Sequence, residues 1–521
     1  MHTPTTIHNF IEIRHSITFK LAWSTFIICL CALQFGYHLA ELNAPGDILS
    51  CNFHKPGPVP SYNDTIWYKY GFEQCIPMSA QGVAYITTSF TVGGLLASAI
   101  LGSTSISMDY GRKPLLIISS LFFVLGSLLM ILANNSWVMN LGRLFNGIGC
   151  GSALIISPIL INELTPINHR GLMGAIMQIA VSVGIFFAQL VSYFYSNDQQ
   201  WRIIFIFSFA IAVLQLVGLF TIPESPKWLI LNNADVDQAT EILQDLRTEH
   251  STIEYEIDHW KHLTFGPIKE RTESSTDEVS PLLQRHNSTV SVCSSVSSRK
   301  SLEPPLVTVM DFIFSYKYRH QFIAVILIMT GQQLSGMNAI TYYGVKILNT
   351  VFNNHNSGSG NRVLVLTCAF SVVNMISSTV VAPLIDRIGR KPLLLASVAT
   401  CGICSLILAI GIPYKYDVAV ITACYGFIIG FAIGLGPIPF LMISELTGHE
   451  VVSLAQSLGT VTNWTSNMII AFSFPLLQNL IGGVVFYIFF IVCAFYFIAF
   501  YYKIPETKGI HHVVEVWRDF E

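Results

Sequence analysis

Long stretches without a charged residue dominate this sequence of 521 residues. The chain holds 28 basic and 31 acidic residues, 59 in all, and 25 of them lie between Pro223 and His320. On both sides of that region the uncharged runs recur, and the last one, 451–502, is 52 residues long. A helix that crosses a bilayer core needs ~20 apolar residues. We therefore expect twelve transmembrane helices, six on each side of a polar centre.

Composition agrees with an all-α membrane protein. The chain is 52% hydrophobic and 11% charged, whereas a soluble domain is about 25% charged. The apolar runs are continuous rather than alternating, which excludes a closed β-barrel. The net charge of −3 gives no reason to expect nucleic acid as a partner. No metal cluster, phosphate-binding loop or nucleophile arrangement is recognisable, so we expect neither an enzyme nor a cofactor.

Basic residues in short loops set the expected orientation. They occur in alternate loops, which share the cytosolic side with both termini: Arg112, Lys113, Arg170, Arg387, Arg390 and Lys391. The first apolar segment is long and lacks a small-residue cleavage site, so it is read as helix one rather than a signal peptide. The expected divisions are a cytosolic tail 1–20, a six-helix half 21–223, a cytosolic loop 224–320, a second half 321–503 and a cytosolic tail 504–521.

The first non-cytosolic loop carries two signs of an oxidising, extracytosolic side. Cys51 and Cys75 both lie in it and are candidates for a disulfide. Asn63-Asp-Thr65 is a glycosylation sequon on the same face. Eight of the 11 cysteines lie inside expected spans, where they are read as small buried side chains.

The two halves repeat one another. Met108-Asp-Tyr-Gly-Arg-Lys-Pro114 follows helix two, and Asp386-Arg-Ile-Gly-Arg-Lys-Pro392 follows helix eight. Glu163 and Glu445 end helices four and ten, and each half closes with a Pro-Glu dipeptide. Two parallel six-helix repeats predict a substrate site near the membrane midplane between them. The acids and bases of the loops predict ion pairs that bridge the halves and close the cytosolic side.

At this point the residues resemble the sugar porters of the major facilitator superfamily, which include the facilitative glucose transporters. The resemblance covers nearly the whole chain. It rests on these segments: Gln332-Gln-Leu-Ser-Gly-Met-Asn-Ala-Ile-Thr-Tyr-Tyr343, Gly142-Arg143, Pro223-Glu-Ser-Pro-Lys-Trp-Leu229, Gly434-Leu-Gly-Pro-Ile-Pro439, Asn463-Trp-Thr-Ser-Asn467 and Pro505-Glu-Thr-Lys-Gly509. It implies a twelve-helix carrier with a central cavity that moves a hexose such as glucose or fructose by alternating access.

Intramembrane amides suit such a substrate, because an amide offers donors and an acceptor to sugar hydroxyls without a charge to desolvate. A single amide in a span is more often helix–helix glue. The resemblance assigns a whole set to sugar contact: Gln178, Gln332, Gln333, Asn338, Asn374, Phe440, Trp464 and Asn467. Ala432 stands where relatives often have Glu, and Phe440 where they usually have Trp, so the sugar preference or affinity is expected to differ.

Helix one holds two ionisable residues, His38 and Glu41, one turn apart. Proton-coupled relatives carry Asp at the position of His38, and facilitative ones carry Asn. Ionisable side chains inside spans are functional candidates, so proton coupling is one reading. The other is that His38 only donates a hydrogen bond, as Asn would.

The resemblance also implies a cytosolic gating network: Asp109, Arg112, Glu163, Arg170, Asp386, Arg387, Arg390 and Glu445. Two positions depart from the family, since Met108 replaces an expected acid and Val452 an expected Arg. A looser inward gate follows as a hypothesis.

The central loop is Ser-rich after an amphipathic first part, about 235–262, with ten serines between Ser274 and Ser301. Its sequence Glu278-Val-Ser-Pro-Leu282-Leu283 has the form of an acidic dileucine sorting signal, which would engage sorting adaptors. We therefore favour a vacuolar, lysosomal or endosomal membrane over the plasma membrane. The competing function is a non-transporting sugar sensor or sorting-related protein that retains the fold.

Overall fold

The computed structural model describes residues 17–51, 62–103, 110–166, 169–232, 235–248, 253–254, 256–258, 260, 309–352, 359–448, 451–508, 510 and 513–518. Eleven apolar segments in this part are long enough to cross a membrane, and the last, Leu454–Lys503, contains two helices, α21 and α22. The described chain therefore has the twelve spans expected, which confirms the fold class. Backbone groups within a bilayer must bond inside the segment, and an α-helix achieves this.

The first half contains six long helices. They are α2 (Phe19–Ala40), α5 (Ala80–Ser103), α7 (Arg112–Leu132), α8 (Ser136–Leu164), α9 (Arg170–Tyr195) and α10 (Trp201–Leu219). Side-chain caps begin several of them. Thr18 accepts a hydrogen bond from the Leu21 amide, and Asn135 accepts one from the Val138 amide. Capping supplies partners for amides that the first turn leaves free.

The second half repeats this order, with two of its spans broken. The spans are α15 (Arg319–Leu334) with α16 (Met337–Phe352), α17 (Ser359–Ile388), α18 (Arg390–Tyr414), α19 (Asp417–Ile433) with α20 (Ile438–Leu446), α21 (Val452–Ile481) and α22 (Val485–Lys503). Gly336 has a φ of 102° at the first break, a conformation that glycine adopts without strain. Pro437 and Pro439 prevent α19 from continuing into α20 as one helix.

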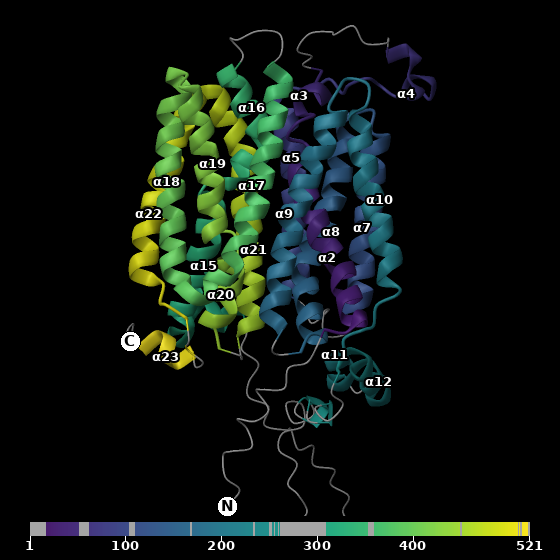
Figure 1. Cartoon of the computed structure of the whole chain (residues 1–521), viewed down its shortest axis with the longest axis vertical. Coiled ribbons are helices and arrows are strands. Elements are labelled where there is room, and N and C mark those ends of the chain that lie inside the picture. The colour runs from purple at the N-terminus through teal and green to yellow at the C-terminus, as the bar shows by residue number, and fades with distance from the viewer. Residues whose placement is uncertain are drawn as a thin grey trace, which may run out of the picture.

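The halves stand side by side as two bundles (Figure 1). They meet where α5 packs along α21 and where α9 packs along α17. Large apolar side chains such as Leu121, Leu125 and Leu128 of α7 are exposed on the outside. An apolar exterior of this kind belongs in lipid.

Short helices cover one end of the bundles. Those after α10 are α11 (Pro226–Leu231) and α12 (Val236–Leu246), and α14 (Val309–Phe314) and α23 (Val513–Trp517) lie at the same end. Arg247, after α12, donates to the carbonyl oxygen of Leu164 at 2.8 Å. Trp517 of α23 donates to the carbonyl oxygen of Leu446 at 2.9 Å. The opposite end holds α3 (Gly46–Leu49) and α4 (Ile66–Lys69) (Figure 1).

Candidate functional site

Four amides form a continuous hydrogen-bonded chain in the second half. Asn338 donates to Gln333, whose Nε2 donates to Asn463 Oδ1 at 3.0 Å. Asn463 Nδ2 donates in turn to Gln332 Oε1 at 2.5 Å. We call these four residues the amide chain. Gln332, Asn338 and Asn463 are buried, so each bond is made away from bulk water.

The two helix breaks position the amide chain. Gln332 and Gln333 end α15 and Asn338 begins α16, so one break turns three amides toward a common point. At the other break, Gln332 Nε2 donates to the carbonyl oxygens of Leu435 and Gly436, at 2.8 and 3.0 Å. These carbonyls are available because the helix stops at Ile433. Non-helical backbone at membrane depth is tolerated where it is buried in protein or lines a cavity.

A second polar group joins the two halves. Ser182 of α9 lies 3.3 Å from Ser378 of α17, and Asn374 Nδ2 is 3.5 Å from the Ser182 hydroxyl. Gln178 lies one turn before Ser182 on α9, and its backbone carbonyl accepts from the Ser182 hydroxyl at 3.4 Å. Asn374 therefore lies at the contact between α9 and α17, and Gln178 lies one turn along α9 from it.

Aromatic rings from both halves meet at Trp464. This α21 side chain is buried, and its ring centroid lies 5.9 Å from that of Phe35 and 5.7 Å from that of Phe90. Gly94 of α5 makes room for it, since a Cβ there would come within 2.6 Å of the indole. Asn467, one turn on, accepts a hydrogen bond from the Tyr342 hydroxyl at 3.2 Å. Phe440 instead packs with the cluster of Val325, Met329 and Ile443.

A small cavity of about 30 Å³ lies between the halves. Polar residues supply half of its lining: Asn43, Gln189, Thr341, Thr367, Ser371 and Asn374. A water molecule needs ~10–15 Å³ measured in this way, so the cavity accommodates water but is too small for a sugar. The Asn43 side chain accepts from the Val345 amide of the other half at 3.0 Å. The halves must therefore separate before a sugar can reach the amides.

His38, Glu41 and Arg143 form a second buried site, in the first half. Arg143 Nη1 donates to Glu41 Oε1 at 2.7 Å and to the His38 carbonyl oxygen at 2.9 Å. His38 Nδ1 is 2.9 Å from the same Glu41 oxygen. All three side chains are at most 1% exposed. We call them the buried triad.

Aromatic rings seal the buried triad. The His38 ring stacks on Phe123 with centroids 5.6 Å apart, and the Arg143 guanidinium lies 4.5 Å from the centre of the Phe90 ring. Three buried atoms have no hydrogen-bond partner: His38 Nε2, Glu41 Oε2 and Arg143 Nε. An ionised Glu41 can only accept, so a neutral His38 beside it would donate through Nδ1 and leave the Nε2 lone pair free.

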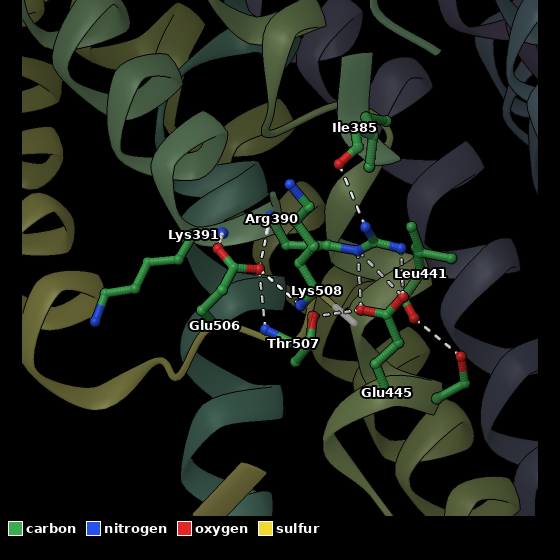
Figure 2. Close-up of polar contacts among 9 residues, drawn as sticks. Ile385, Arg390, Lys391, Leu441, Glu445, Glu506, Thr507 and Lys508 are labelled. Atoms are coloured by element: carbon green, nitrogen blue, oxygen red, sulfur yellow. Dashed lines mark hydrogen bonds and ion pairs between the residues drawn. The ribbon is translucent and has the colours of Figure 1, made fainter. Parts of the chain in front are cut away.

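The repeated loop motifs form one matched cluster in each half. In the second half, Arg390 binds Glu445, with its Nη2 2.9 Å from Oε1 (Figure 2). Glu506 accepts from the Arg390 and Lys391 amides at 2.9 and 3.0 Å and so caps α18. In the first half, Arg112 Nε lies 3.0 Å from Glu163 and Glu224 caps α7 in the same way.

In both loop motifs, the backbone conformation and the nearby capping glutamate require a glycine. Gly111 and Gly389 have φ values of 79° and 113°, where other residues are strained. A Cβ at Gly111 would also come within 2.6 Å of Glu224 Oε2, and one at Gly389 within 2.8 Å of Glu506 Oε2. Both ion pairs join helices of the same half, whereas the sequence suggested bridges across the halves.

Several predicted residues cannot be placed. Asp109, Glu278, Leu282 and Leu283 lie outside the described residues, as do the side chains of Arg170 and Asp386. Arg387 is exposed, and its carbonyl oxygen accepts from Lys508.

In the loop between α2 and α5, a disulfide joins Cys51 and Cys75, the two cysteines that the sequence singled out. Asn63 is exposed in the same loop. Arg202, at the start of α10, ties this loop to the bundle. Its guanidinium donates to the carbonyl oxygens of Ile131, Ala133 and Glu73, at 2.7 to 2.9 Å.

The sequence reasoning missed two central residues. Asn463 was read only as part of a family motif, and Arg143 likewise. A buried arginine needs an acid partner, so Arg143 beside an intramembrane Glu41 was a usable signal. Asn463 lies one turn before Asn467 on α21, and only the fold brings it to Gln332.

The chain matches the family model described as "Sugar (and other) transporter" over residues 24–517. A probable metabolite transport protein of Saccharomyces cerevisiae is 32% identical, with 98% of this chain and 97% of the relative covered. Vacuolar protein sorting-associated protein 73 of the same yeast is 31% identical, with 95% of each covered. The facilitated glucose transporter member 1 of Gallus gallus is 28% identical, with 92% and 89% covered.

Among solved structures, the xylose transporter of E. coli in a partially occluded inward-open conformation is similar in fold. The TM-score is 0.70 at 19% sequence identity, and the match covers 95% of this chain and all of that one.

Proposed function

Because the chain belongs to the sugar transporter family of the major facilitator superfamily, as an integral multi-pass membrane protein, we propose that it carries a hexose such as glucose or fructose by alternating access. The amide chain carries this proposal. Its four members have no formal charge, and three of them flank the helix break between α15 and α16. The name of the Gallus gallus relative, a glucose transporter, supports a hexose.

Recognition follows from how the amide chain is bonded. Each amide is hydrogen-bonded to a neighbouring amide, so a sugar binds by replacing those bonds with bonds to its own hydroxyls. For a substrate with matching hydroxyls, this exchange changes the free energy little. A substrate that lacks one leaves a buried amide unpaired, at a cost of ~1–3 kcal/mol. The site therefore selects by hydroxyl pattern rather than by charge.

The buried triad favours proton coupling over uniport. Glu41 and Arg143 balance one another while His38 is neutral. A proton taken up at the free Nε2 of His38 gives the triad a net positive charge. Unbalanced charge is costly inside a membrane protein, so protonation changes the relative free energies of the conformations that expose or seal the triad. Uniport, with His38 only a hydrogen-bond donor to Glu41, is the alternative.

For the membrane, we propose a vacuolar, lysosomal or endosomal location. The dileucine pattern at Glu278, Leu282 and Leu283 supports it, as does the name of the vacuolar sorting relative in yeast. That name also supports the other candidate function, a sorting-related or sensing protein that keeps the fold without transporting.

Uptake of radiolabelled hexoses into proteoliposomes, with and without an inward proton gradient, tests the proposal. Uptake accelerated by the gradient supports proton-coupled sugar transport, and uptake indifferent to it supports uniport. Folded protein that moves none of glucose, fructose, mannose, galactose or xylose would contradict sugar transport and favour the sorting or sensing function.

A further inference from the structure

A groove of about 340 Å³ opens on the outer surface between α5 and α8, and no residue of the amide chain lines it. Its lining includes Tyr85, Ser89, Val92, Trp137, Asn140 and Leu144, which we call the membrane groove. Trp137 is 83% exposed and Tyr85 54% exposed, so the groove faces the surroundings of the bundle. Its volume lies within the ~300–1,000 Å³ range of small-molecule sites.

The membrane groove lies in the leaflet opposite the short cytosolic helices. Both α5 and α8 begin at that end, at Ala80 and Ser136. Helix α8 has 29 residues and is therefore ~43 Å long, against a hydrocarbon core of ~30 Å. Its first turns accordingly lie in the polar boundary. Asn140, four residues into α8, is ~6 Å below the helix start, where headgroups give way to acyl chains.

Two polar side chains, Ser89 and Asn140, meet inside the groove, which Thr88 also lines. The Ser89 hydroxyl lies 2.7 Å from Asn140 Oδ1 and 2.8 Å from the Tyr85 carbonyl oxygen. Asn140 Nδ2 donates to the Ser136 carbonyl oxygen at 2.8 Å. The pair still has a second amide hydrogen and free lone pairs. A lipid that brings one hydroxyl to this depth can bond this remaining amide hydrogen and these lone pairs.

The lining also discriminates between lipids. It contains no Lys, Arg, Asp or Glu among the residues that line it, so it offers a phosphate headgroup no cation. Trp137 and Tyr85 instead present flat rings, and below them Val92 and Leu144 complete an apolar slot. A rigid, flat hydrocarbon with one neutral hydroxyl fits these features better than a phospholipid.

From these contacts we propose that the membrane groove binds a sterol, with the sterol hydroxyl on Ser89 and Asn140 and its ring system along Val92 and Leu144, about one turn deeper. The site borders the seam between the halves, since the Tyr85 ring lies 5.9 Å from that of Phe472 on α21. A sterol held here touches α5 at the place where it packs on α21, so its binding responds to the separation of the halves.

Photolabelling tests the proposal without any transport assay. Full-length protein is placed in phosphatidylcholine vesicles with a diazirine-bearing 3β-hydroxysterol, irradiated and mapped by mass spectrometry. We expect labelled peptides from α5 and α8, and competition by unlabelled 3β-hydroxysterol that exceeds competition by its 3α epimer. Asn140→Leu should lower labelling about three- to tenfold, the worth of one hydrogen bond.

Two further variants keep the test decisive. Leu144→Trp fills the groove and should abolish the labelling even where Asn140→Leu unfolds the protein. Leu125→Trp adds the same ring to the exposed lipid face of α7 and should leave the labelling unchanged. Labelling spread evenly over α7 and α22, or unchanged in Leu144→Trp, overturns the proposal. Equal competition by both epimers would show an acyl-chain groove without hydroxyl recognition, which also overturns it.

Discussion

The guanidinium of Arg143 donates to Glu41 at 2.7 Å, and the two side chains are 1% and 0% exposed. This pair ties α8 to the end of α2 in the core of the first half. Removing one member of a buried ion pair leaves the other charge without compensation. The pair is therefore both a structural tie and the charge that a proton on His38 would unbalance.

Replacing His38 with Asn should separate transport from the proton gradient. The amide of Asn can still donate to Glu41 but cannot take up a proton. We expect gradient-driven accumulation to disappear while exchange of labelled for unlabelled sugar at equal pH on both sides remains. Uptake with an imposed pH difference measures the accumulation, and counterflow in proteoliposomes at equal pH measures the exchange. Accumulation as strong as in the unchanged protein would contradict the proton role.

Glu41→Gln should destabilise the protein by about 3–5 kcal/mol, because it leaves Arg143 buried without its acid. Thermal unfolding in detergent measures the loss. The double variant Glu41→Gln with Arg143→Gln removes both charges and should recover part of the stability. A single variant as stable as the unchanged protein would argue against an ionised pair.

Asn463→Leu should weaken sugar binding. It leaves Gln332 and Gln333 without a bridging partner, and an unpaired buried amide costs ~1–3 kcal/mol, so we expect KM to rise about tenfold or more. Gln215→Leu is the matched control. Gln215 is buried in α10 and bonds Ser120 and Cys31 within the first half. It should lower thermal stability and leave KM unchanged. An equal rise in KM in both variants would contradict a role for Asn463 in sugar binding.

Gly389→Ala should strain the cap at the start of α18. The substitution combines a φ of 113° with a Cβ placed 2.8 Å from Glu506. Left-handed backbone costs a non-glycine residue ~1–3 kcal/mol. Gly111→Ala is the matched change in the first half. We expect both to lower the melting temperature, whereas Gly174→Ala, which meets open space within α9 and replaces a helical Gly with a better helix former, should not lower it. An unchanged melting temperature in Gly389→Ala would contradict a stabilising role for the contact of Glu506 with the start of α18.

Reduction of the Cys51–Cys75 bond should loosen the outer loop. The bond spans 24 residues, and closing a loop of that length is worth ~3 kcal/mol. The double variant Cys51→Ser with Cys75→Ser should be cut faster by protease added to the outer face. Equal protease half-lives would contradict the disulfide's role.

Asn63 in the same loop is a candidate for glycosylation. An increase in mobility on gels after Asn63→Gln, from protein made in eukaryotic cells, would show that this loop carries a glycan.

The sequence by itself determined the twelve helices, the two repeated halves and the family. These features are local, since apolar run length fixes a span and a contiguous motif fixes a family. It also indicated which amides and ionisable residues belong inside the membrane. The disulfide could be anticipated because only two cysteines fall in the first outer loop.

Only the tertiary structure decided which of these side chains meet. Asn463 and Gln332 are 131 positions apart and Arg143 and Glu41 are 102 apart, yet each pair shares a hydrogen bond. Such contacts depend on helix rotation, on the breaks at Gly336 and Pro437, and on how closely α8 approaches α2. Apolar run length constrains none of these, because a helix of the same hydrophobicity can span the membrane at any rotation about its axis.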